Sequence, residues 1–432
     1  MSKIAAPRAG RPSVREHVDG IVDPNSFVEI NGTEGGQALI DGRPVIVGPS
    51  SELLEWALAR RQPYIALISG PGGALRGGPR DLGLLDPVSG MSSHFSESTP
   101  AMFSRQRGIP VVAAIVHHSF GNSTFFTSLC DFVVQLEGTC MAMAGPRVLA
   151  IGTGEKVTME ELGGAGVHRN NGQTDEVADS LEVIYGWIRK VLSYLPSASG
   201  APLPVRDLGE SSSVAELANL SEVHQEVLDL VAAIVDQQTF FELKADYCPG
   251  LVTGFAFLGG IPVGVIANDP SIEDGSFSPE ACLKATRHVC MCDAFGLPIV
   301  LLLDTPGMTG EPYGEREAPI SRAMMLAQAV HLAATPKCFV VVRRAFGPGL
   351  LVTGSARVGT DLVIAWPGAR IGFSDGAALL NGSWRVDLRE WVRDGVIEPS
   401  ETRATLIRHL RSVLGDCPIG PAGPLSAWPV GF

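Results

Sequence analysis

Two glycine-containing breaks hold the residues of this chain that could do chemistry. The first follows an apolar run at residues 110–116, and the second follows the apolar run from Cys338 to Val342. Their residues are Phe120, Gly121 and Asn122 in the first break and Phe346, Gly347, Pro348 and Gly349 in the second. A glycine directly after a buried strand lets backbone N–H groups approach a ligand closely. Two such groups, one of them at the start of a helix, could form an oxyanion hole that stabilises a negatively charged oxygen.

Proline limits the donors in the second break. Pro348 has no N–H, so the donors there must come from Gly347 or Gly349. In the first break, Asn122 keeps its N–H and adds a side chain that could either intrude or donate. Taken alone, each break is better explained as an ordinary strand-to-helix turn.

Three further groups lie near the breaks in the sequence. Residues 69–74 (SGPGGA) and 304–307 (DTPG) follow buried runs, where glycine turns either expose N–H donors to a ligand or simply end the strands. The pair His117-His118 could include a base, but strand alternation places one ring in the core and the other against a facing layer. The pair Arg343-Arg344 could bind a phosphate, a carboxylate or merely an acidic neighbour.

No other catalytic constellation is visible in the sequence. It has no Ser-His-Asp arrangement with a nucleophile elbow, no phosphate-binding P-loop and no cluster of metal-ligating residues. A chemistry that needs oxyanion stabilisation but little help from side chains fits the residues that remain.

Both breaks belong to an internal duplication, because four pairs of blocks recur in the same order. The pairs are residues 21–27 with 234–240, residues 38–48 with 256–268, residues 63–72 with 298–307, and residues 110–145 with 336–375. The second pair predicts hairpins around Asp41-Gly42 and Gly259-Gly260. Recurrence of this kind is typical of a repeat architecture. The first half is shorter, since 19 positions separate Pro44 from Pro63 and 36 separate Pro262 from Pro298.

Apolar strands alternate with helices in each half, which predicts an α/β fold with crossover connections. We expect domains at residues 1–205 and 206–432, joined by a linker rich in Pro, Ser and Gly at residues 195–204. The predicted helices lie near residues 14–22, 51–61, 176–194, 279–295, 321–334 and 400–414. We expect Ser400, which follows Pro399, to cap the last of them.

Composition excludes several classes of protein. The 432 residues allow two domains, and the formal charge of −13 argues against nucleic acid or an anionic membrane as a partner. No run of about 18 apolar residues predicts a membrane span. The eight cysteines include no CxxC pair, so we expect free thiols, no bound metal and a cytoplasmic location.

Several longer stretches resemble the carboxyltransferase (β) subunits of biotin-dependent acyl-CoA carboxylases of the propionyl-CoA and methylmalonyl-CoA type. They include VREHVDGIVDPNSFVEI at 14–30, TGEKVTMEELGGAGVH at 153–168, FFELKADYCPGLVTGFAFLGGIPVGVIAN at 240–268 and HVCMCDAFGLPIVLLLDTPGM at 288–308. The resemblance runs in order along nearly the whole chain. It implies two tandem crotonase-like (ClpP/crotonase) domains, with dimers that stack into hexamers.

The resemblance also implies an activity. Such enzymes transfer a carboxyl group from carboxybiotin, carried by a separate biotin-bearing protein, to the α-carbon of an acyl-CoA or acyl-carrier thioester. One oxyanion hole serves the acyl thioester and the other the biotin ureido oxygen, at a dimer interface. The implied site residues are Gly121, Asn122, Gly347 and Gly349 as oxyanion residues, Gly72, Gly73, Ala74, Phe120 and Leu351 beside the substrate and its coenzyme A, and Phe346 and Pro348 beside biotin.

Two departures from the family pattern keep alternatives open. The family has a second glycine at the position of Asn122, and Gly-Gly-Ala at residues 347–349. The missing donor at Pro348 motivates a biotin-independent decarboxylase of malonyl-type thioesters, or another enolate-forming reaction. A second alternative is a non-catalytic subunit that supports a related active chain.

Overall fold

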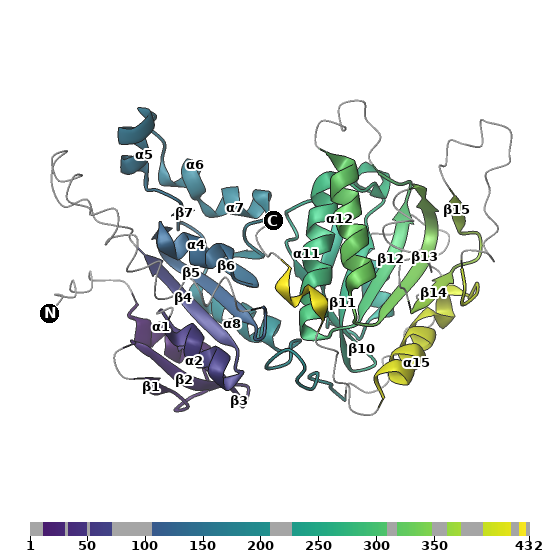
Figure 1. The fold of residues 1–432 in the computed structure, drawn as a ribbon, viewed down its shortest axis with the longest axis horizontal. Helices are drawn as coiled ribbons and strands as arrows, with labels where there is room; N and C mark the ends of the chain where they lie inside the picture. The colour runs from purple at the N-terminus through teal and green to yellow at the C-terminus, as the bar shows by residue number, and fades with distance from the viewer. Residues whose placement is uncertain are drawn as a thin grey trace. The chain divides into compact units, whose positions relative to one another are not determined.

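The computed structural model describes residues 12–30, 33–49, 52–70, 106–207, 227–308, 318–347, 361–372, 392–415 and 423–428. The chain divides into two compact units, residues 1–192 (unit 1) and 193–430 (unit 2). Each unit is an α/β fold built on one sheet (Figure 1).

In unit 1 the sheet has the strand order β1-β2-β3-β4-β5-β6-β8, and the short strand β7 pairs with the end of β5. The strands are β1 (Val28–Ile30), β2 (Gly35–Ile40), β3 (Arg43–Gly48), β4 (Tyr64–Gly70), β5 (Val111–Phe120), β6 (Phe132–Leu136), β7 (Met141–Ala142) and β8 (Glu176–Ala178). Strands β1 to β3 pair antiparallel, and all later pairs are parallel. Their ends therefore meet at one edge of the sheet, which is the edge that carries the first break.

Seven described helices belong to unit 1. They are α1 (Val14–Ile21), α2 (Glu52–Arg60), α4 (Asn122–Ser128), α5 (Pro146–Thr153), α6 (Met159–Gly163), α7 (Ala165–Asn171) and α8 (Leu181–Leu192). Helix α1 begins where it does because Ser13 and Glu16 form a capping box. Helix α8 is amphipathic and buries Ile184, Ile188 and Val191, which lie on one face at helical spacing.

Unit 2 repeats this arrangement. Its sheet has the order β14-β13-β12-β11-β10-β9, and β15 pairs with the last residues of β13. The strands are β9 (Phe241–Leu243), β10 (Leu251–Leu258), β11 (Ile261–Asn268), β12 (Ile299–Thr305), β13 (Lys337–Phe346), β14 (Leu362–Ala365) and β15 (Arg370–Gly372). The described α-helices are α10 (Val227–Ile234), α11 (Pro279–Phe295), α12 (Pro319–Leu332) and α15 (Thr402–Leu414).

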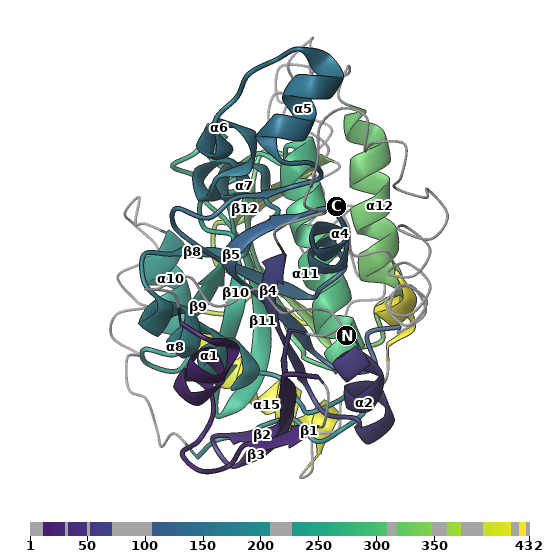
Figure 2. The ribbon, with the colours of Figure 1, turned by 90° about the vertical axis from the view of Figure 1, so that its left-hand side faces the viewer.

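The core of unit 2 lies on both faces of its sheet. Helices α11 and α12 lie side by side in both views of the ribbon (Figures 1 and 2). Side chains at alternate strand positions pack instead with α10 and α15; examples are Val231, Ile234, Ala256, Val263, Val340, Ile364, Leu406 and Leu410. Alternation of this kind places the odd and even residues of a strand on opposite faces, so unit 2 is a three-layer α/β/α structure.

The duplication predicted from matched blocks is confirmed by the equivalent strand orders, and matched aspartates repeat it in side-chain detail. In unit 1, Asp23 accepts hydrogen bonds from the N–H groups of Asp41 and Gly42 at the tip of the β2–β3 hairpin, at 3.0 and 2.8 Å. Arg189 of α8 pairs with the same carboxylate at 3.0 Å. One aspartate thus holds the hairpin turn and the last helix of unit 1 together.

In unit 2, Asp236 has the same role. It accepts from the N–H groups of Gly259 and Gly260 at the tip of the β10–β11 hairpin, at 2.9 and 2.8 Å, and pairs with Arg403 of α15. All four hairpin-tip residues have positive φ, as the predicted tight turns require. Further matched aspartates hold the starts of neighbouring strands; Asp131 accepts from Val111 N–H, Asp361 from Lys337, Asp175 from Val133 and Asp394 from Val363.

Two local predictions were wrong. The helix predicted over residues 176–194 begins only at Leu181, because Glu176–Ala178 forms the edge strand β8. Ser400 does not cap α15; it lies within a short 3-10 turn, and Glu401 is the capping residue.

The segment predicted as a linker, residues 195–204, contains no helix or strand. It is packed against the protein, since Leu195, Ala198 and Leu203 are buried. Among the described residues, no helix is long and apolar enough to cross a membrane.

Candidate active site

The first break is a turn between β5 and α4. Gly121 lies between them with φ of 71°, a left-handed conformation that favours glycine. Its N–H donates to the carbonyl oxygen of Met143 at 3.1 Å, and less closely to that of Ala142 at 3.4 Å. That donor is therefore already engaged within unit 1. The backbone donors that remain at the turn are those of Asn122 and Ser123, because the first N–H groups of a helix have no acceptor inside it.

A network of hydroxyl groups supports this turn from beneath. Ser119, which is fully buried, lies 2.8 Å from Ser123 between side-chain oxygens. The Thr124 hydroxyl donates towards the carbonyl oxygens of Ser119 and Ala142, at 3.2 and 3.1 Å. These contacts join the end of β5, the first turn of α4 and β7. This network was not predicted from the sequence, although hydroxyl residues stand on both sides of Gly121.

The second break lies at the corresponding end of β13. Phe346 is the last residue of the strand, and Gly347 follows it, buried and with φ of 54°. Beside it, Gly307 is close enough that an added Cβ would approach the Phe346 carbonyl oxygen to 3.2 Å. The Gly307 N–H donates to the Thr305 hydroxyl at 3.1 Å. The structure therefore brings the predicted loop 304–307 against the predicted break.

Several predicted site residues lie outside the described residues. They are Gly72, Gly73, Ala74, Pro348, Gly349 and Leu351. The backbone of Asn122 is described as the first residue of α4. Phe120, Gly121, Phe346 and Gly347 lie at the ends of two equivalent strands, as predicted.

Arg343 and Arg344 meet acidic neighbours. Asp304, which is buried, accepts from the Nε groups of both arginines, at 2.9 Å for Arg344. Arg344 also donates to both carboxylate oxygens of Asp274 at 2.7 Å. Hydrogen bonding to Asp274, followed by that to Asp304, raises the pKa of Arg344. Of the predicted alternatives, the structure therefore shows the acidic neighbour.

The two histidines face different surroundings. The His118 Nδ1 accepts a hydrogen bond from the Cys140 N–H at 3.1 Å, and its ring stacks on Phe120 with centroids 6.3 Å apart. The His117 ring meets the edge of His17, a buried residue of α1, at 6.0 Å. Both rings are half-buried. Neither is immersed in the core, so the predicted burial of one ring was too strong.

Both central strands carry the same irregularity just before their breaks. The register of β4 with β5 shifts between Ile68 and Gly70, and that of β12 with β13 shifts between Leu303 and Thr305. A bulge of this kind re-aims the side chains of the longer strand. The bulge contains His117-His118 in unit 1 and Arg343-Arg344 in unit 2. The matched blocks already pair these residues in sequence, but the bulge that they share was not predicted.

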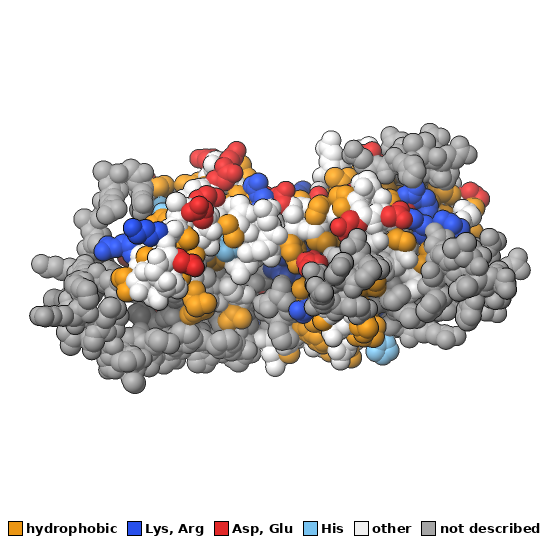
Figure 3. All heavy atoms as spheres, turned by 90° about the horizontal axis from the view of Figure 1, so that it is seen from above, with side chains coloured by type: hydrophobic (Ala, Val, Ile, Leu, Met, Phe, Trp, Pro, Cys, Tyr) orange, Lys and Arg blue, Asp and Glu red, His pale blue; other side chains and the backbone are white. Residues whose placement is uncertain are grey.

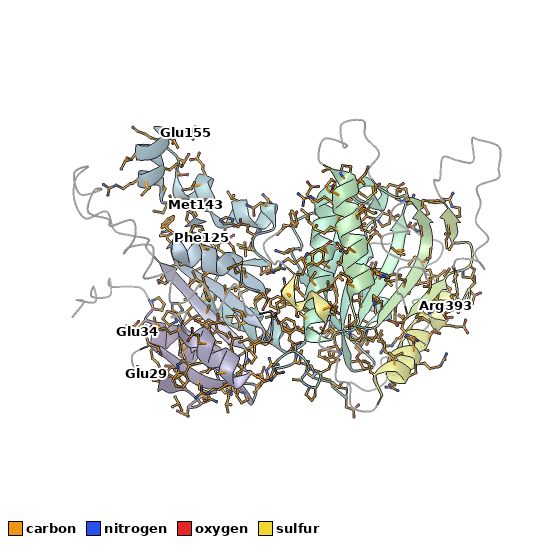
Figure 4. All side chains as sticks on the ribbon, viewed as in Figure 1. Glu29, Glu34, Phe125, Met143, Glu155 and Arg393 are labelled. Carbon is orange, nitrogen blue, oxygen red and sulfur yellow. The ribbon has the colours of Figure 1, made fainter. Side chains whose placement is uncertain are left out.

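The surface around the first turn is partly apolar. Met143, whose carbonyl accepts from Gly121, has a side chain that is 72% exposed, and Phe125 of α4 is 40% exposed (Figure 4). Helix α5 buries none of its residues fully. Seen from above, the described surface mixes acidic, basic and hydrophobic side chains (Figure 3). Among the described residues, no group of three or more His, Cys, Asp or Glu side chains could hold a metal ion.

Comparison with known proteins gives consistent results. A family model described as the carboxyl transferase domain matches residues 52–414. The beta5 subunit of a biotin-dependent acetyl-/propionyl-coenzyme A carboxylase from Mycobacterium leprae is 29% identical, over 89% of this chain and 78% of its own length. The alpha subunit of methylmalonyl-CoA decarboxylase from Veillonella parvula is 28% identical, over 93% of this chain and 90% of its own length.

A solved structure shows the same fold. It is a hexameric transcarboxylase 12S with methylmalonyl-coenzyme A and methylmalonic acid bound. It matches this chain with a TM-score of 0.83 and 26% identity, over 93% of this chain and 90% of that chain.

Proposed function

Because this chain belongs to the carboxyl transferase family, and its two α/β units are tandem crotonase-like domains, we propose that it transfers a carboxyl group from carboxybiotin to the α-carbon of an acyl-CoA. The observation that carries the proposal is the pair of equivalent turns at the ends of β5 and β13, both within the matched region. Two turns suit a reaction with two oxygens to stabilise, one on each reactant.

The proposed site residues come from the two turns and from the family resemblance. At the first turn, we propose that Gly121 supplies the positive φ and that the N–H groups of Asn122 and Ser123 serve the thioester oxygen. At the second turn, the resemblance assigns Gly347 and Gly349 to the biotin oxygen, beside Phe346 and Pro348. It assigns the substrate and its coenzyme A to Gly72, Gly73, Ala74, Phe120 and Leu351.

Cofactor and partners follow from the relatives. A relative named as a subunit of a biotin-dependent carboxylase supports the proposal that biotin is used, on a separate carrier protein. A hexameric transcarboxylase with a bound coenzyme A ester supports the proposal that this chain assembles into homo-oligomers. The domain limits 1–205 and 206–432 stay predictions. A cytoplasmic location is supported by the described cysteines, none of which forms a disulfide.

Mass spectrometry of the thioester tests the proposal. The purified chain is incubated with a carboxylated biotin-carrier protein and either propionyl-CoA or acetyl-CoA, and we expect the thioester to gain one carboxyl group. Parallel reactions contain methylmalonyl-CoA or malonyl-CoA without biotin. Loss of CO2 in these reactions alone would replace the proposal with the decarboxylase alternative. An unchanged thioester in every reaction, with an intact carrier, would replace it with the non-catalytic subunit.

A further inference from the structure

The side chains of the two bulges differ in their hydrogen-bond partners. In unit 2, both arginines of the bulge bond to Asp304, and Arg344 bonds to Asp274 as well. In unit 1, the register places Ser69 opposite the bulge where unit 2 has Asp304. Ser69 is exposed and brings no carboxylate. Among the described residues, His118 therefore has no counterpart of the acidic partner that the arginines of unit 2 share.

One contact fixes the hydrogen-bonding state of His118. Its Nδ1 accepts from the Cys140 N–H at 3.1 Å, and an atom that accepts from an N–H must present a lone pair. The single proton of the neutral ring is then on Nε2. The orientation of the ring is fixed as well, because it stacks on Phe120 at an interplanar angle of 28°.

The Nε2–H of His118 is a donor on a ring whose orientation is fixed, near the end of β5. It has no hydrogen-bond partner among the described residues, and it is not among their buried atoms that lack one. The ring is half-exposed, and it precedes Gly121 by three residues on the same strand end. A neutral imidazole held in this way is suited to polarise an oxygen, because it donates a hydrogen bond without introducing a charge.

We propose that His118 is a ligand-binding residue of the first turn, where its Nε2–H donates to an oxygen on the acyl side of a bound CoA ester. The inference rests on the proposed function and adds a side-chain donor to a site otherwise built from backbone. The oxygen belongs either to the thioester carbonyl or to the carboxylate of the carboxylated product. Both are acceptors for the same donor, and binding measurements separate them.

Binding of three ligands tests the proposal without requiring turnover. Titration calorimetry measures the affinity of free coenzyme A, propionyl-CoA and methylmalonyl-CoA for the full chain and for His118→Asn. The asparagine Oδ1 stands near the position of Nδ1, so it keeps an acceptor for Cys140. It removes the donor at the Nε2 position, because the amide NH2 group of asparagine ends one bond short of that position. His118→Phe is the second variant, because it keeps the stacked ring and also lacks the donor. His331→Asn, at an exposed position on α12, is the matched control.

We expect both His118 variants to bind free coenzyme A as the wild type does and to bind the esters more weakly. Loss of a hydrogen bond to the neutral carbonyl weakens both esters by about 2- to 10-fold, and loss of one to the carboxylate weakens methylmalonyl-CoA alone by about 10- to 100-fold. Wild-type affinity for both esters in either folded variant would overturn the inference and leave the proposed function intact. A wild-type chain that binds neither ester would overturn both.

Discussion

At Gly121, the backbone leaves β5 with φ of 71°, and its N–H donates to the Met143 carbonyl. The glycine therefore shapes the turn through its backbone angle, while the free donors come from the two residues after it. This division of roles is a refinement of the predicted oxyanion hole, in which Gly121 itself was expected to donate. It also explains why Asn122 is tolerated there, since a residue at the first helical position can donate its N–H whatever its side chain.

A substitution at Gly121 distinguishes the effect of the turn's backbone geometry on activity from its effect on the stability of the fold. Gly121→Ala and Gly138→Ala both place a Cβ at φ near +70°, and neither Cβ meets an atom within 4 Å. We expect each to lower the free energy of unfolding by about 1 kcal/mol, through backbone strain alone. Only Gly121→Ala should also lower kcat/KM, by about 10-fold or more, because the donors of the turn move. Equal activity of the two variants would contradict this role.

At the scale of elements, α1 and α8 meet through a buried polar contact. The His17 Nδ1 lies 2.9 Å from the Tyr185 hydroxyl, and the His117 ring lies on another side. Burial lowers the pKa of His17, and the nearby His117 lowers it further, while Glu16 opposes this weakly. Between the two helices, the folded chain therefore favours the neutral form of the His17 imidazole.

Acid should weaken this helix pair. The unfolded chain binds a proton on His17 at a pH near 6.5, whereas the folded chain resists it until lower pH. Stability is therefore complete above pH 6.5 and falls as the pH drops from there towards the lowered folded pKa. Chemical denaturation between about pH 7.5 and 5 should show that the free energy of unfolding depends less on pH for His17→Gln than for the wild type. An equal slope in both would contradict the assignment, and His331→Gln, which is exposed, should match the wild type.

The sequence predicted the features that are encoded within one continuous stretch of residues, and it did not predict those that depend on contacts between distant residues. Strands such as β12 are apolar runs with clear ends, so the α/β fold and the duplication were both predictable. Residues 176–178 were not, because a three-residue edge strand carries too little pattern beside an amphipathic helix. The sequence pairs Asp23 with Asp236, but their role in holding the hairpin tips was not predicted, since an acidic residue in a loop looks solvated until its N–H partners are known. Likewise, the bond from Gly121 to Met143 joins residues that only the folded sheet brings together.

At the scale of the whole molecule, each unit exposes large apolar side chains. Ile320 and Met324 on α12 are 65% and 49% exposed, and Ile151 on α5 is 66% exposed. Exposed apolar residues at helical spacing, such as Ile320 and Met324, are typical of surfaces that pack against another chain. Together with the hexameric relative, they support a homo-oligomer as the working form.

Charge placed on α12 should weaken that assembly. We expect Ile320→Glu combined with Met324→Glu to lower the sedimentation mass from a multiple of 45.6 kDa towards a single chain, because like charges would enter the contact. The unfolding midpoint of the dissociated chain should change little, since both side chains are exposed. Ser412→Glu, at an exposed position on a different helix, α15, is the control. A double variant that keeps the wild-type mass would exclude α12 from the contact.

The matched bulges have a consequence for how such a chain can diverge. In an enzyme whose two sites came from separate identical copies, any substitution would alter both sites at once. Here the two halves lie in one polypeptide, and each is encoded by its own codons. The bulge of unit 1 can therefore carry His117-His118 while that of unit 2 carries Arg343-Arg344. A substitution in one bulge therefore leaves the residues of the other bulge unchanged, so the two halves can diverge independently.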